Sequence, residues 1–212
     1  GLFAYLSYEG DSANELSFWL GAMPNWGNSM ANDTIFREEL LSQAGVYNYF
    51  TGSNDRSNGI FAHGGAYYRH KFNQDGHQIS ASINGNFSSD KSTSFDNRRY
   101  VSPYEYNWDR RTGNSGSNPS VSADVNYVLP FSEQQALALG VQSRYSNSSN
   151  VNVVDTLVGE NYVNDIWRSS GSSRFTNRNE VYATYQQKIG DFTIKPGLRL
   201  QNYNTGIRYD MD

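Results

Sequence analysis

Residues 77–89, "HQISASINGNFSS", alternate between apolar and polar side chains over their whole length. The odd positions from 79 to 87 are apolar or small, whereas the even positions from 78 to 88 are Gln, Ser or Asn. Because side chains alternate across a β-strand, this pattern predicts a strand with one dry and one wet face. Two environments suit the dry face: the core of a soluble β-sandwich, or lipid.

Seven further stretches carry the same period-two pattern in varying quality. Pro196 interrupts the last of them, and since proline removes a ladder donor we expect a β-bulge at 195–197. Such a bulge would also explain why Tyr203 falls out of phase. With the first stretch, the pattern predicts eight strands, at residues 2–9, 15–22, 60–72, 77–89, 121–129, 136–146, 180–188 and 192–201.

The connections between these strands alternate between short and long. The short ones, "GDSAN", "NQDG", "PFSEQ" and "IGD", have the composition of tight hairpin turns, and the long ones cover 23–59, 90–119 and 147–178. In an up-and-down meander every tight turn then lies at one end. That asymmetry is typical of outer-membrane barrels, whereas a Greek-key sandwich does not sort its loops in this way.

Composition agrees with a barrel and excludes several other classes. No apolar run approaches the roughly 18 to 20 residues of a membrane-spanning helix. The formal charge of −4 gives no overall reason to bind nucleic acid, and the lack of cysteine excludes disulfides and thiolate chemistry. The sequence thus predicts an all-β, antiparallel up-and-down meander of about eight strands, a segment of a transmembrane outer-membrane β-barrel. The residues expected to face lipid are Ile79, Ile83, Phe87, Val125 and Leu139.

The wet face carries more cations than anions. A cationic lumen wall would guide an anionic or polar ligand. The alternative is internal ion pairing with a plug or with neighbouring strands. The residues expected to line the lumen are Arg69, Lys71, Arg144, Lys188 and Arg199.

The stretch "RRYVSPYEYNWDRRTGN" (98–114) interleaves aromatic and basic side chains. Aromatic faces stack on rings and sugars, and guanidinium groups fork onto carboxylates or phosphates. This suits ligand capture at the outer mouth of a barrel, although Tyr and Trp would also pin a strand where it leaves the bilayer. The candidate ligand-binding residues are Tyr104, Tyr106, Trp108, Arg110 and Arg111.

No pattern of catalysis or metal binding is recognised. His63 and His70 have opposite parity in one expected strand, and His77 begins the next. Residues 32–45, "NDTIFREELLSQAG", predict a short helix with a polar N-cap and a glycine stop, so the adjacent acids Glu38 and Glu39 do not face each other. We therefore predict no enzyme, no metal site and no cofactor.

Longer pieces of the sequence resemble a known family. "GHQISASINGNFSSD", "SVSADVNYVLPFSEQQALALGVQSRYS" and "NEVYATYQQKIGDFTIKPGLRLQNYNT" resemble the outer-membrane β-barrels of TonB-dependent receptors. Residues 60–205 match best, and residues 1–59 fit as earlier strands and a loop. The resemblance implies a large barrel, commonly of about 22 strands, plugged by an N-terminal domain. It also implies uptake of a nutrient ligand of unknown identity across the outer membrane, energised by a TonB-type energy-transducing protein.

We read residues 1–212 as one all-β segment of such a barrel, without signal peptide or plug domain. The opening "GLFAYLSYEG" is strand-like and lacks a basic n-region, so we expect it to be the cut edge of a longer protein. Outer-membrane lipid is an expected partner and nucleic acid is not. Two rivals stay open: a plugless passive pore or structural outer-membrane protein, and a soluble β-rich binding or adhesion module.

Overall fold

The computed structural model describes residues 1–38, 46–73, 76–102 and 106–210, and the regular structure in these ranges is β-strand. The first strands are β1 (Leu2–Tyr8), β2 (Asn14–Glu38), β3 (Val46–Lys71) and β4 (Gln78–Ser102). They are followed by β5 (Tyr106–Ser117), β6 (Ser120–Ser132), β7 (Gln135–Val158) and β8 (Asn161–Asn164). The last are β9 (Ser170–Ile189), β10 (Phe192–Ile194) and β11 (Gly197–Asp210). In this part of the chain, no helix is long and apolar enough to cross a membrane.

The strands form one antiparallel sheet in which chain neighbours are sheet neighbours. Its order is β1-β2-β3-β4-β5-β7-β9-β10. β6 continues β5 beside β4 and β7, and β11 continues β10 beside β9, while the short β8 pairs only with β7. The sheet therefore has eight strand positions, and the predicted up-and-down meander is confirmed.

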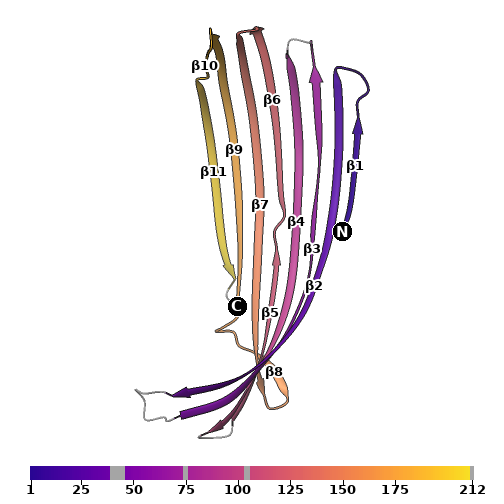
Figure 1. The fold of residues 1–212 in the computed structure, drawn as a ribbon. Coiled ribbons are helices and arrows are strands. Elements are labelled where there is room, and N and C mark those ends of the chain that lie inside the picture. The colour runs from indigo at the N-terminus through magenta and orange to yellow at the C-terminus, as the bar shows by residue number, and fades with distance from the viewer. Residues whose placement is uncertain (39–45, 74–75, 103–105, 211–212) are drawn as a thin grey trace.

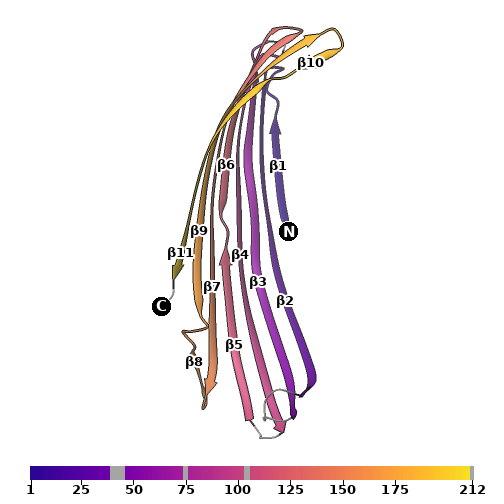
Figure 2. The same cartoon turned by 90° about the vertical axis from the view of Figure 1, so that its left-hand side faces the viewer.

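The four tight turns predicted from the sequence lie at one end of the sheet, whereas the tight turn between β7 and β8, with Gly159 at φ of 65°, lies at the other. The connections β1–β2, β3–β4, β6–β7 and β9–β10 gather at the top of Figure 1, and the β7–β8 hairpin lies toward the bottom. Gly190 in the β9–β10 turn has φ of 60°, a left-handed conformation that glycine adopts without a steric cost. Figure 2 shows the strands bending together toward that end.

The three expected long loops are wrong over most of their length. β2 and β3 stay paired from Asn14↔His70 out to Glu38↔Val46, so most of 23–59 is strand. β4 and β5 fill most of 90–119 in the same way, and β7, β8 and β9 fill most of 147–178. These extensions carry mostly polar side chains on both faces, with scattered apolar ones such as Met30 and Val101. The regular alternation that marks a half-buried strand is therefore missing from their sequence.

The predicted helix at 32–45 is also wrong where it is described. Residues 32–38 belong to β2 and pair with β3, and 39–45 lie outside the described residues. Thr34, Ile35 and Phe36 favour strand, and a continuous ladder with β3 outweighs a local capping pattern.

Pro196 interrupts its strand without the predicted bulge. Ile194 pairs with Gln187 and Gly197 pairs with Thr184, so the register is the same on both sides of the break. The Pro196 carbonyl still accepts a hydrogen bond from the Tyr185 amide at 3.0 Å. The proline thus costs one ladder donor and shifts nothing.

The sheet has almost no hydrophobic core. Val154 is the one buried hydrophobic side chain among the described residues. The accessible surface is 15286 Å², against about 9,900 Å² for a compact globular protein of 23.9 kDa. The described fold therefore lacks the dry interior that a soluble sandwich needs.

Candidate functional site

The ladder register assigns every strand residue to one of two faces. Ser82 aligns with Asp124 and then, through Gln142, with Glu180, and we name this side the polar face. Ile83 aligns with Ala123 on the opposite side, which we name the apolar face. The partition follows the alternation expected from the sequence.

Side chains on the polar face are joined by hydrogen bonds. Asp124 accepts hydrogen bonds from the Ser82 hydroxyl at 2.5 Å and from the Asn126 amide at 3.0 Å. The Tyr182 hydroxyl donates to Asn126, and its ring covers Gly140, where a side chain would collide with it. The network spans β4, β6, β7 and β9 and holds the polar face in one arrangement.

Ion pairs also lie on this face. Arg69 pairs with Glu15, and both side chains are about one third exposed. Glu180 is only 3% exposed and pairs with both Arg178 and Arg199. All five cations predicted to line a lumen, Arg69, Lys71, Arg144, Lys188 and Arg199, lie on the polar face.

The five residues predicted to face lipid lie on the apolar face. Four are well exposed: Ile83 at 51%, Val125 at 44%, Phe87 at 42% and Leu139 at 40%. Ile79 is partly exposed. No other layer of the described chain covers these side chains.

The apolar band on this face crosses the register rows obliquely. On β2 the last apolar residue of the band is Trp26, which lies on the same register row as Lys91 of β4. On β4 itself the last apolar residue of the band is Phe87. On β11 the band stops at Leu200, which is level with Ala81 of β4 through β9, β7 and β6. The band edge thus moves by ten residues over six strand steps.

The oblique edge of the apolar band is what tilted strands in a flat membrane would produce. With a rise of about 3.3 Å per residue and strands about 4.8 Å apart, the shift corresponds to a tilt of roughly 45–50°. Barrel strands tilt by about 35–45°. A horizontal bilayer therefore explains why Asn179 and Asn202, on the same register row as Ile83, are polar: at their strands the row has passed the band edge.

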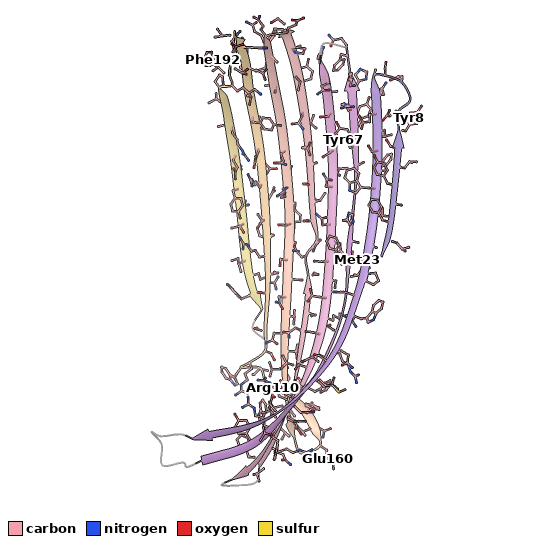
Figure 3. All side chains as sticks on the ribbon, in the orientation of Figure 1. Tyr8, Met23, Tyr67, Arg110, Glu160 and Phe192 are labelled. Atoms are coloured by element: carbon pink, nitrogen blue, oxygen red, sulfur yellow. The ribbon has the colours of Figure 1, made fainter. Side chains whose placement is uncertain are left out.

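Figure 3 places Tyr8 and Phe192 toward the tight-turn end and Arg110 and Glu160 toward the other end. β2 has 25 residues, which at about 2.3 Å of depth per residue span roughly 58 Å. The apolar band of a barrel is about 25 Å tall. The strands thus continue about 30 Å beyond the band, as a sheet extension with mostly polar side chains on both faces.

An aromatic and basic cluster lies on the polar face of this extension. The Arg98 guanidinium lies 5.8 Å from the Tyr49 ring centre and 5.2 Å from that of Trp108. The Arg110 guanidinium lies 5.0 Å from the Trp108 ring centre and donates a hydrogen bond to the Asp96 carboxylate at 2.9 Å. We name Tyr49, Arg98, Trp108 and Arg110 the Arg98 cluster.

Arg98 and Arg110 differ in what they offer a ligand. The Asp96 carboxylate neutralises Arg110, with both side chains about 30% exposed. Arg98 is exposed and makes its described contacts with aromatic rings. A guanidinium whose contacts are aromatic rings keeps its hydrogen-bond donors for an incoming oxyanion.

The predicted ligand-binding residues whose side chains are described are divided between the two faces of the sheet. Trp108 and Arg110 lie on the polar face, whereas Arg111 lies on the opposite face, paired with Asp155. Tyr104 lies outside the described residues, and Tyr106 is described only as the first residue of β5.

Arg98 and Tyr49 belong to the cluster but were not among the predicted residues. The parity of 98–114 separates Arg110 from Arg111 in the sequence already. The partnership of Arg98 with Trp108 requires the β4–β5 register, and that of Arg98 with Tyr49 requires the β3–β4 register.

Arg111 and Asp155 anchor the β7–β8 hairpin. Two Arg111 nitrogens donate to one Asp155 oxygen at 2.9 and 2.7 Å, and the Asn164 amide donates to the other at 3.2 Å. Asp155 is buried, and the Arg111 guanidinium also stacks 5.1 Å from the Tyr162 ring centre. Hydrogen bonding from Arg111 holds the pKa of the Asp155 carboxyl below its ordinary value of 3.8, with Asn164 acting in the same direction against burial.

A lowered pKa makes this anchor sensitive to acid. Its stabilisation is fully present above pH 3.8 and is lost as the pH falls through the lower folded-state pKa. At neutral pH we expect Asp155→Ala to lower the free energy of opening the β7–β8 hairpin by about 2 kcal/mol. This loss is smaller than that for a fully buried ion pair because the Arg111 side chain is 43% exposed. Amide hydrogen exchange of 161–164 in the full-length protein should accelerate about 30-fold. Asp96→Asn, on the other face, should leave that exchange unchanged; unchanged exchange in Asp155→Ala would contradict the anchor.

Comparison with protein families assigns the chain. Residues 70–211 match the model of the outer membrane protein beta-barrel family. The match covers most of the chain, from the end of β3 through β11. The chain belongs to the outer membrane protein beta-barrel family, and its place is the bacterial outer membrane.

The chain was also compared with curated proteins and with solved structures. The search of curated proteins gave no match. Among solved structures, the ferric citrate transporter FecA in its unliganded form shares 9% identity over 98% of this chain and 38% of that chain, with a TM-score of 0.33. A lipopolysaccharide binding protein shares 5% identity over 98% of this chain and 76% of that one, with a TM-score of 0.13. The chain thus spans well under half the length of the transporter.

Proposed function

We propose that this chain is the barrel segment of an outer-membrane receptor that takes up a nutrient ligand with energy from a TonB-type protein. The barrel is wide and holds a plug domain supplied by another part of the full-length protein. The apolar face contacts lipid and the polar face lines the lumen. No enzymatic activity is assigned to the segment.

The observation that carries the proposal is the open, tilted sheet. Among the described residues, β1 pairs only with β2 and β11 only with β9, so both edges offer unpaired backbone groups. In a bilayer such edges must be paired, because no water is present to satisfy them. Eight tilted strand positions that form an open sheet favour a sector of a larger barrel. The ion pairs on its polar face favour a lumen that is filled.

The Arg98 cluster is the proposed capture site at the outer mouth. It lies about 25 Å beyond the apolar band, because Arg98 follows the band edge at Phe87 by eleven residues of β4 and each residue adds about 2.3 Å of depth. A ligand arriving from outside would meet the polar face here first. Its chemistry favours a ligand with an anionic group next to a flat ring, since Arg98 supplies the donors and Tyr49 and Trp108 supply the stacking surfaces.

Ion conductance separates the receptor from a passive pore. We expect the full-length protein in a planar bilayer with KCl to conduct little, because a plug fills the lumen. Stable single-channel currents from each inserted molecule would contradict the receptor and support the plugless pore. A full-length protein that stays monomeric and soluble without detergent would support the soluble module instead.

Binding of an aromatic anion tests the capture site. With pyrenetetrasulfonate as the probe, fluorescence anisotropy of the full-length protein in nanodiscs should report saturable binding. Arg98→Gln should weaken it about tenfold, since a hydrogen bond to a charged group contributes about 1.5 kcal/mol. Arg56→Gln is the matched control, because Arg56 lies on the apolar-parity side of the same extension. Equal loss in both variants would mean general charge attraction and not a site.

A further inference from the structure

Charge is distributed unevenly over the polar face. On β2 to β6 the cations of this face are accompanied by carboxylates, among them Glu15, Asp96 and Asp124. On β7, β9 and β11 the described polar-face carboxylate is Glu180 alone. Against it stand Arg144, Arg174, Arg178, Lys188 and Arg199.

Two of these cations are placed directly opposite each other. Arg144 of β7 and Arg178 of β9 form a cross-strand pair in the ladder. Cβ atoms of such pairs are about 5 Å apart, and like charges at that position destabilise a sheet. An anion between or beside the two guanidinium groups would offset this repulsion, and the described residues supply one, Glu180, to Arg178 but not to Arg144.

Glu180 cannot neutralise both Arg144 and Arg178. It is buried and already pairs with Arg178 on its own strand and with Arg199 on β11. Asp124, the next carboxylate on this face, lies toward β4, where it accepts hydrogen bonds from Ser82 and Asn126. Arg144 is exposed, and no ion pair to it occurs among the described residues.

We infer that Arg144 and Arg178 bind an oxyanion, a carboxylate or a phosphate, on the inner wall of the barrel. The two guanidinium groups supply paired donors from adjacent strands, and Tyr203, level with Arg178 on β11, borders the site. Arg199 adds positive charge near the site, because it shares the Glu180 carboxylate with Arg178. The inference rests on the proposed function only in taking the polar face as the lumen wall.

The oxyanion has two sources with the same chemistry. It is either a dissolved anion on its way through the lumen or an acidic side chain of the same polypeptide outside these residues. Labelling of arginine by phenylglyoxal, read residue by residue by mass spectrometry on the full-length protein in nanodiscs, distinguishes them. Sodium pyrophosphate is the probe, and Arg56 reports non-specific effects.

For a dissolved anion, we expect Arg144 and Arg178 to be labelled in buffer and protected at least fivefold by 10 mM pyrophosphate, on the order of ten times a millimolar Kd. For an internal carboxylate, both are protected in buffer and become labelled in about 1 M NaCl, which screens the pair. Labelling that pyrophosphate does not change, or protection that salt does not relieve, overturns the inference.

Variants supply the second measurement. Arg144→Gln should abolish the protection of Arg178 by pyrophosphate, whereas Arg69→Gln, on the same face but paired with Glu15, should leave it intact. Protection of Arg178 that survives in Arg144→Gln would contradict a shared site. None of these results depends on energised uptake, so a failure here is separable from a failure of the conductance experiment.

Discussion

Replacing Ile83 by arginine is expected to destabilise the full-length protein by about 3 kcal/mol. Ile83 is 51% exposed on the apolar face and lies on β4 midway between Ile79 and Phe87, the residue at the band edge. Arginine on the lipid face near the bilayer midplane costs roughly 2–4 kcal/mol in barrels. Denaturant unfolding in lipid vesicles, followed by tryptophan fluorescence, measures the change.

Asn202→Arg is the matched control because Asn202 lies on the same face and the same register row. On β11 that row has passed the oblique edge of the band, so the arginine reaches polar surroundings and should cost less than about 1 kcal/mol. Equal large costs would mean that the bilayer follows the register row and the strands are not tilted. Two negligible costs would mean that the apolar face does not contact lipid.

The difference between Ile83 and Asn202 also explains what the sequence could predict. Alternation is visible wherever one face is dry and the other wet, as at 77–89, so the strands within the band were predictable together with their faces. In 27–38 and 90–102 polar side chains predominate on both faces, so the pattern carried no strand signal there. The position of the bilayer on each strand is set by tilt, which only the register between strands reveals.

The candidate sites depend on register in the same way. The cations of the polar face were visible as single residues, and the parity of Arg69 and Arg144 placed them on the wet side. The opposition of Arg144 and Arg178, and the stacking of Arg98 on Trp108, join residues more than nine positions apart. No local pattern contains that information, because one slip of the register would exchange the partners.

Removal of the Glu180 carboxylate is the change on the polar face that we expect to destabilise the protein most. Removing a buried partner of an ion pair leaves uncompensated charge and commonly costs 3–5 kcal/mol. In Glu180→Ala, Arg178 and Arg199 lose their shared carboxylate while Arg144 stays opposite Arg178. We expect a loss of about 3 kcal/mol in vesicle unfolding, against less than about 1 kcal/mol for Glu15→Ala, whose pair with Arg69 is partly exposed.

An added anion should reverse part of that loss. Whatever binds only the folded state stabilises it, and at 100 times its Kd the gain is about 2.7 kcal/mol. Pyrophosphate should therefore raise the unfolding midpoint of Glu180→Ala more than that of the unmodified protein, because the competing carboxylate is gone. If pyrophosphate raises both midpoints equally, the anion does not bind among the arginines that Glu180 joins, and the charge on β7, β9 and β11 serves the fold by another route than a shared oxyanion.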